Sequence, residues 1–122
     1  MRRTFESCRG RRAAQPSVIW NTRAVIAAFS ITPIGGSDSV GAQVARAVKL
    51  VRASGLPNET NAMFTNVEGD WDDVMNLVKG CVETVAETAP RVSAVIKIDY
   101  RPGVTGALTT KVESLEHALE EL

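Results

Sequence analysis

The sequence predicts an α+β fold in a single domain, and three observations lead to this prediction. The chain has 122 residues, which is a usual length for one domain. Short apolar stretches with period-two polarity alternate with longer stretches whose apolar residues recur at helical spacing. The resulting order is strand, helix, strand, strand, helix, strand, followed by one more helix. The sequence contains no internal repeat.

The first predicted strand covers residues 24–32, AVIAAFSIT. This stretch is apolar, contains β-branched residues and is too short for a buried helix. Pro33 and the pair Gly35 and Gly36 follow it, and both residue types interrupt regular structure. We therefore expect a central strand that ends at Thr32.

A helix is predicted for residues 37–55. Ser37 or Asp38 can cap its start, and Gly55 can take the left-handed conformation that ends a helix. Its apolar positions, which recur at the spacing of one helix face, are Val40, Val44, Ala47, Val48 and Val51.

A second helix is predicted for residues 70–89, with Asp70 as its cap. Gly80 lies inside this helix and should cost about 1 kcal/mol relative to alanine. The apolar stripe consists of Val74, Leu77, Val78, Cys81, Val82 and Val85. Both helices therefore have one face suited to covering a sheet.

Residues 58–69 and 91–100 supply the remaining strands. The first stretch is long enough for two short strands joined by a bend, which makes an antiparallel hairpin. The second, RVSAVIKIDY, alternates between apolar and polar residues. A loop at residues 101–110 leads into a final amphipathic helix at 111–122. The economical arrangement is a ferredoxin-like βαββαβ fold, with a four-stranded antiparallel sheet and two helices on one face.

Charge divides the chain into a basic leader and an acidic body. Residues 1–23 hold six of the 14 basic residues and one of the 14 acidic ones. We predict that this segment is a disordered extension, with a targeting segment or a basic interaction arm as alternatives. The domain itself spans residues 24–122 and has eight basic and 13 acidic residues. We expect no nucleic-acid binding, because the body is acidic, and no membrane span, because no apolar run approaches the length of about 20 residues that a span needs. The cysteines show no disulfide pattern, so we expect a reducing compartment and a cytoplasmic location.

Residue types that support metal or nucleophilic chemistry are scarce. Cys8 and Cys81 have no spacing typical of a disulfide framework or a zinc site. His117 is the only histidine and lies in the polar C-terminal helix, far from Ser30 in the expected fold. The PIGG stretch at 33–36 lacks the pattern of a nucleotide-binding loop. We predict no catalytic residue, no metal and no cofactor beyond a possible bound ligand.

Side-chain alternation predicts a polar surface on the sheet face that the helices leave uncovered. Residues two apart in a strand point the same way, so the apolar positions identify the covered face. Such a polar face can be a solvated surface with a cross-strand ion cluster, a dimer surface or the lining of a ligand site. The residues assigned to it are Ser30, Thr32, Phe64, Asn66, Glu68, Lys97 and Asp99.

Four stretches, in this order and spacing, resemble the small thiamine-binding protein family, which is related to the YkoF-like domains. They are AFSITPIGG, MFTNVEGDWDDVMNLVK, PRVSAVIKIDYR and TKVESLE. The resemblance covers about residues 24–118. It implies a ferredoxin-like fold, self-association into dimers and tetramers, and binding of thiamine or its pyrimidine moiety without catalysis.

The polar face suits such a ligand. Its carboxylates can face the cationic thiazolium, its hydroxyl and amide groups can bind the aminopyrimidine, and Phe64 can form an apolar wall. Lys97 is expected to pair with one of the carboxylates. We therefore predict a non-catalytic protein that binds thiamine or a related aminopyrimidine. Two alternatives are a structural or regulatory oligomerisation module that binds another protein, and an acid–base enzyme that uses Glu68 and Asp99.

Overall fold

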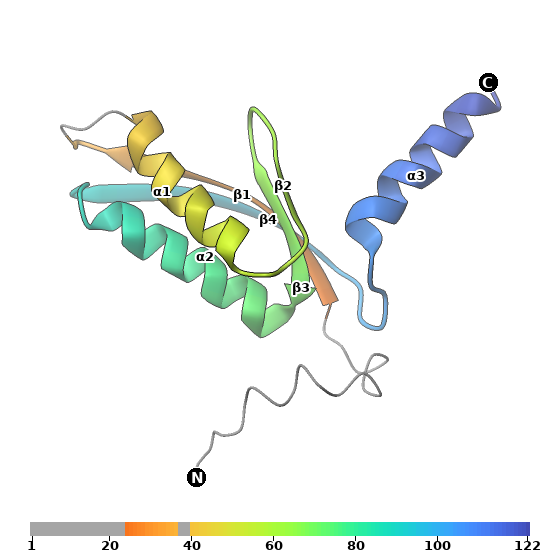
Figure 1. Ribbon diagram of the computed structural model, residues 1–122, viewed down its shortest axis with the longest axis horizontal. Helices are drawn as coiled ribbons and strands as arrows, with labels where there is room; N and C mark the ends of the chain where they lie inside the picture. The colour runs from red at the N-terminus through yellow and green to blue at the C-terminus, as the bar shows by residue number, and fades with distance from the viewer. Residues whose placement is uncertain (1–23, 37–39) are drawn as a thin grey trace, which may run out of the picture.

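The computed structural model describes residues 24–36 and 40–122 and confirms the predicted α+β fold (Figure 1). The predicted extension 1–23 and the predicted cap at Ser37 or Asp38 lie outside the described residues. In chain order the elements are β1 (Ala24–Ile34), α1 (Val40–Ala53), β2 (Asn58–Thr60), β3 (Thr65–Asp70), α2 (Trp71–Ala86), β4 (Arg91–Tyr100) and α3 (Ala107–Glu120).

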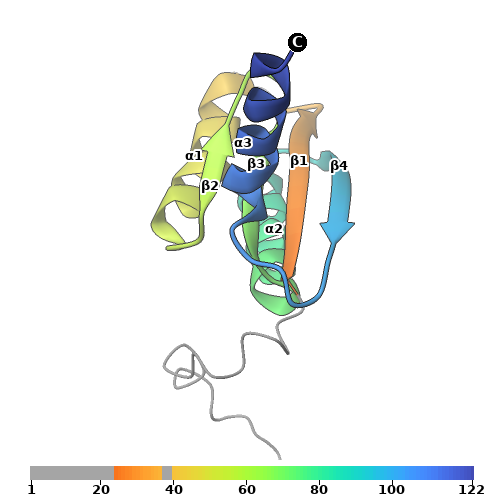
Figure 2. The same cartoon turned by 90° about the vertical axis from the view of Figure 1, so that its right-hand side faces the viewer.

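The four strands form one antiparallel sheet in the order β2-β3-β1-β4. This order is the ferredoxin-like one that the sequence predicts. β1 pairs with β3 only as far as Phe29, but with β4 as far as Ile34. Helices α1 and α2 cover one face of the sheet, and α3 leaves the domain on the opposite face (Figures 1 and 2).

The core lies between the sheet and the two covering helices. As predicted, alternate residues of β1 are buried there, from Val25 to Ile31. The start of α2 is also as predicted, because the Asp70 side chain accepts a hydrogen bond from the backbone N–H of Asp72 at 3.2 Å. Helix α1 is followed by Gly55, whose φ of 81° is the expected left-handed conformation. The helix residues of the core are Ala47, Val51, Val74, Val78, Cys81 and Val85.

Strand β4 forms one edge of the sheet, and its helix-facing side is only partly covered. Val92 and Ile98 are half-buried, whereas Ile96 and Tyr100 are 39% and 48% exposed. The Trp71 ring meets the Tyr100 ring edge-on, with 5.8 Å between ring centroids. Trp71 thus anchors the start of α2 against this edge.

Strand β1 continues through Pro33 to Ile34, so the predicted end at Thr32 is wrong by two residues. The backbone N–H of Arg101 donates to the Ala24 carbonyl, which shows that even-numbered residues of β1 point their backbone groups towards β4. The backbone groups of odd-numbered residues, including Pro33, therefore point towards the β3 side. Pairing between β1 and β3 stops at Phe29, before Pro33 is reached. A proline costs the sheet no hydrogen bond at such an edge.

Candidate functional site

The strand register arranges the predicted polar residues in rows across the uncovered sheet face. Taken from β3 through β1 to β4, the rows are Glu68–Ile26–Asp99 and Asn66–Ala28–Lys97, followed by Ser30–Val95 and Thr32–Ser93. Neighbouring rows are about 6.6 Å apart along the strands. The carboxylate row therefore lies about 13 Å from the row of Ser30.

This separation divides the predicted residues between two pockets. The smaller pocket contains Glu68 and Asp99, and the larger contains Ser30, Thr32 and Phe64. Asn66 and Lys97 line neither of these two pockets. The register thus places six of the seven predicted residues, all except Phe64, on one sheet face, but the seven do not form one cluster.

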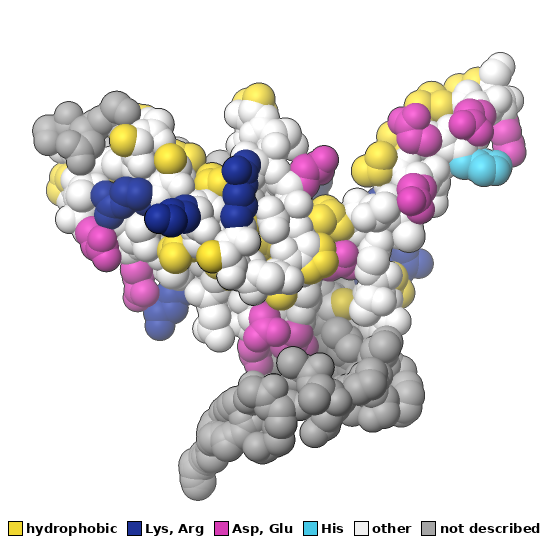
Figure 3. Space-filling view, in the orientation of Figure 1, with side chains coloured by type: hydrophobic (Ala, Val, Ile, Leu, Met, Phe, Trp, Pro, Cys, Tyr) yellow, Lys and Arg dark blue, Asp and Glu magenta, His cyan; other side chains and the backbone are white. Residues whose placement is uncertain are grey.

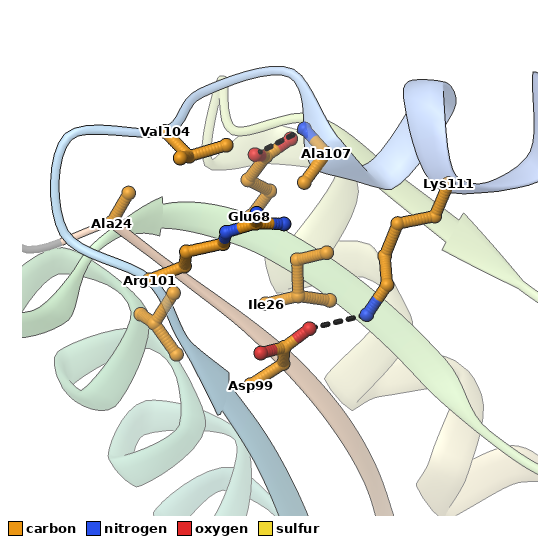
Figure 4. Close-up of a pocket in the computed structure, with 9 residues that line it drawn as sticks. Ala24, Ile26, Glu68, Asp99, Arg101, Val104, Ala107 and Lys111 are labelled. Atoms are coloured by element: carbon orange, nitrogen blue, oxygen red, sulfur yellow. Dashed lines mark hydrogen bonds and ion pairs between the residues drawn. The ribbon is translucent and has the colours of Figure 1, made fainter. Parts of the chain in front are cut away.

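In the smaller pocket, Glu68 fastens the start of α3 (Figure 4). One carboxylate oxygen accepts a hydrogen bond from the Ala107 N–H at 2.8 Å, and the other accepts from the Leu108 N–H at 3.3 Å. Gly106, the residue before the helix, offers no side-chain cap. Glu68 is only 6% exposed and supplies a negative charge to the positive end of the helix dipole.

The predicted start of the last helix at residue 111 is therefore wrong by about one turn. Helix α3 begins at Ala107, because Glu68 satisfies its first backbone N–H groups from another strand. No nearby side chain signals this start, since the cap comes from 39 residues earlier in the chain.

Asp99 holds the same helix through an ion pair with Lys111 (Figure 4). The hydrogen bond from Lys111, followed by the charge of that ammonium, lowers the pKa of the Asp99 carboxyl. Arg101 and Lys97 lower this pKa through weaker charge interactions. The expected pairing with Lys97 is thus replaced by Lys111, because the first turns of α3 bring this lysine over the carboxylate row.

The smaller pocket is too small for a heterocyclic ligand. Its volume is about 20 Å³, and about one water molecule fits in a space of that size. The lining residues are Ala24, Val25, Ile26, Glu68, Asp99, Arg101, Val104, Ala107 and Lys111. In this structure Glu68 and Asp99 contact α3. That they also contact a ligand stays a prediction.

The larger pocket has a volume of about 250 Å³ and lies between α1, β1 and the connection from β2 to β3. This is close to the lower end of the range for small-molecule sites, about 300 to 1,000 Å³. None of the described residues that line it is charged. They are Phe29, Ser30, Ile31, Thr32, Val44, Ala47, Val48, Val51, Thr60, Asn61, Ala62, Met63, Phe64 and Thr65. The pocket thus combines an apolar wall with a few hydroxyl and amide groups.

A hydrogen-bonded turn shapes one side of the larger pocket. The Asn61 side-chain oxygen accepts from the N–H groups of Met63 and Phe64 at 2.9 and 2.8 Å, and the Asn61 N–H donates to the Phe64 carbonyl at 2.9 Å. These bonds place Phe64 at the pocket.

Sequence reasoning missed Asn61, although an asparagine just before a short strand is a typical turn residue. It also missed Val44 and Val48, which it assigned only to the helix that covers the sheet.

Cys81, the described cysteine, lies outside both pockets and is buried. Burial raises the pKa of its thiol from 9.0 to about 11. Such a thiol is a packing group rather than a nucleophile.

Residues 24–36 and 40–122 contain no group of three or more His, Cys, Asp or Glu that could hold a metal ion. Within the same ranges, no helix is both long and apolar enough to cross a membrane.

Comparisons with known proteins give a consistent result. A family model described as thiamine-binding protein matches residues 27–116. A UPF0045 protein from Mycobacterium bovis is 57% identical over 96 residues, which is 78% of this chain and 94% of the relative. A solved structure of a hypothetical protein from Methanocaldococcus jannaschii has a TM-score of 0.70 and 34% identity, covering 78% of this chain and 98% of that one. A domain of unknown function from Bacillus cereus has a TM-score of 0.67 and 33% identity, with coverages of 72% and 88%.

Proposed function

Because this chain belongs to the thiamine-binding protein family, we propose that it binds thiamine or a related aminopyrimidine without catalysing a reaction. The observation that carries this proposal is the 250 Å³ pocket, to which Ser30, Thr32 and Phe64 contribute. An aminopyrimidine is a flat ring with hydrogen-bond donors and acceptors at its edge. A largely apolar pocket with a few polar groups suits such a ring.

The remaining predicted residues, Asn66, Glu68, Lys97 and Asp99, lie in the neighbouring rows of the same sheet face. The two carboxylates are balanced by nearby cations, because Lys111, Arg101 and Lys97 all act on Asp99. We assign these four residues to the cationic part of the ligand.

The lining of the larger pocket supports a non-catalytic role. Its described residues include no Asp, Glu, His, Cys or Lys, and general acid–base catalysis, or activation of a serine or threonine nucleophile, needs such a group within hydrogen-bond reach. A carrier, a buffer or a sensor of the ligand needs only binding. The cytoplasm stays the expected location, which cell fractionation can test.

Mass spectrometry of ligand released from natively purified protein tests the proposal directly. We expect a thiamine-sized or aminopyrimidine-sized mass. Calorimetric titration should show saturable binding, and thiamine at 100 times its dissociation constant should stabilise the fold by about 2.7 kcal/mol. The absence of binding at millimolar thiamine would exclude this function.

Self-association is the second part of the proposal, and α3 supports it. Val112, Leu115 and Leu119 are 55%, 58% and 51% exposed on this helix. Their spacing of three and four residues forms the apolar stripe of a helix that pairs with another helix. Figure 3 shows hydrophobic side chains along one side of α3 and acidic ones along the other. We propose a homo-oligomer, with a tetramer of two dimers as the expected form.

The exposed stripe also supports the alternative function, an oligomerisation module that binds another protein. The two functions differ in their need for a small ligand. A protein that associates but binds no thiamine-type compound would have this second function.

A further inference from the structure

We propose that the backbone edge of β1 at Ile31, where pairing with β3 has ended, binds the aminopyrimidine ring through a pair of hydrogen bonds. This inference rests on the proposed function, because it specifies which part of the ligand enters the larger pocket. It depends on the strand register, on the turn at Asn61 and on the uncharged pocket lining.

The backbone groups of Ile31 face the pocket side of the sheet. Odd-numbered residues of β1 point their N–H and C=O groups towards β3, and Phe29 is the last of them with a β3 partner, Thr65. Two residues further along, the register would pair Ile31 with Met63. Among the described residues, no strand pairs with β1 on this side beyond Phe29.

The turn at Asn61 prevents Met63 from pairing with Ile31. The Met63 N–H donates to the Asn61 side chain at 2.9 Å instead of to β1, and Met63 is 74% exposed. The chain therefore turns away from β1 where the next pair would form. Ile31 and Met63 both line the pocket that results.

An aminopyrimidine offers the same donor and acceptor pattern as the strand residue that Ile31 lacks as a neighbour. In an antiparallel hydrogen-bonded pair, each residue presents its N–H donor and its C=O acceptor side by side to the other. The ring nitrogen and the adjacent amino group of a 4-aminopyrimidine offer the same pattern, an acceptor beside a donor. The amino group would donate to the Ile31 carbonyl, and the ring nitrogen would accept from the Ile31 N–H.

The surrounding residues favour a ring over a peptide strand in this position. Val44 and Val48 of α1 and Phe64 of the connection line the same pocket. A volume of about 250 Å³ between a helix and a turn accommodates a small ring system rather than an added strand. The uncharged lining also disfavours the cationic thiazolium inside, because a buried charge needs a partner. The thiazolium therefore lies outside the pocket.

Ligand analogues test the hydrogen-bond pattern on the unmodified protein. Calorimetric titration would compare thiamine, 4-amino-5-hydroxymethyl-2-methylpyrimidine and oxythiamine, in which an oxo group replaces the 4-amino group. We expect the free aminopyrimidine to bind, and oxythiamine to bind at least about tenfold more weakly than thiamine. In the orientation of thiamine, the ring N–H of oxythiamine faces the Ile31 N–H, and its oxo group faces the Ile31 carbonyl. Equal affinity for thiamine and oxythiamine would overturn the backbone contact.

Pocket-filling variants test the location. Val48→Trp places a large side chain in the pocket and should abolish thiamine binding. Ala45→Trp is the matched control, since Ala45 is exposed on the same helix and does not line the pocket. Circular dichroism and melting curves of both variants monitor folding. If Val48→Trp does not fold, Val44→Trp tests the location in its place, and the analogue series on the wild type tests the contact.

The outcomes separate this inference from the proposed function. If the wild type binds no thiamine-type compound, the proposed function fails, and this inference fails with it. If the wild type binds thiamine and folded Val48→Trp binds it equally well, the family function stands and the Ile31 site is wrong. Loss of binding in Val48→Trp alone, together with discrimination against oxythiamine, supports the site.

Discussion

The carboxylate of Glu68 in β3 accepts a 2.8 Å hydrogen bond from the backbone N–H of Ala107, the first residue of α3. The two residues lie 39 positions apart in the chain and, together with the Asp99–Lys111 ion pair, join the sheet to α3. A conventional helix cap is local, whereas this one belongs to the tertiary structure.

Replacing Glu68 should release α3 while leaving the core folded. Glu68→Ala removes both acceptors, and loss of a helix cap costs about 0.5 to 2 kcal/mol. Hydrogen exchange should accelerate at the amides of Ala107 and Leu108 but not in α1 or α2. Glu59→Ala is the matched control, because this exposed glutamate removes the same charge from β2. Unchanged exchange in Glu68→Ala would contradict the capping role.

Asp99 should titrate below its ordinary pKa of 3.8 because Lys111 stabilises the carboxylate. The folded pKa is the lower one, so the ion pair stabilises the attachment of α3 above about pH 3.8, and this contribution is lost as the pH falls through the lowered pKa. NMR titration of the carboxyl carbon measures the shift. Lys111→Met should return the pKa towards 3.8, whereas Lys97→Met should have a smaller effect.

Gly80→Ala should stabilise the protein. A Cβ at this helical position would meet only Leu50, at 3.9 Å, which is ordinary van der Waals contact. The gain should be about 1 kcal/mol, and the melting temperature should rise by about 4 to 8 °C for a domain of this size. Gly55→Ala is the contrasting variant, since its φ of 81° disfavours any side chain and should reduce stability by about 1 kcal/mol.

Leu115→Asp should weaken self-association, because it places a charge in the middle of the apolar stripe of α3. Thr110→Asp adds the same charge to an exposed position of α3 outside the stripe and should leave the assembly unchanged. Light scattering at micromolar concentration gives the mass of each form. A wild-type protein that is monomeric under these conditions would contradict the proposed assembly.

Local sequence signals predicted the elements well because each element contains its own signal. The valines of α1 and α2 show helical spacing, and the alternation from Val25 to Ile31 correctly identified the buried side of β1. The Asp70 cap and the left-handed Gly55 also depend on neighbouring residues only.

The candidate site was harder to predict because it depends on register and on where strand pairing stops. Alternation places Ser30 and Glu68 on one face but does not reveal the distance of about 13 Å between their rows. The larger pocket exists because pairing between β1 and β3 ends at Phe29. The turn at Asn61, where this pairing stops, depends on two hydrogen bonds to the Asn61 side chain and one between backbone groups, and an apolar pattern does not reveal such bonds.

The cap provided by Glu68 also has a consequence for the order of folding. An isolated helix of 14 residues is marginal in water, and Gly106 offers α3 no side-chain cap of its own. The amides of its first turn gain their acceptor only when β3 is in place, so we expect α3 to form after the sheet. The apolar stripe on α3 would then be organised late, when the core has already closed. Such an order would keep the proposed association surface away from unfinished chains and would make assembly follow folding.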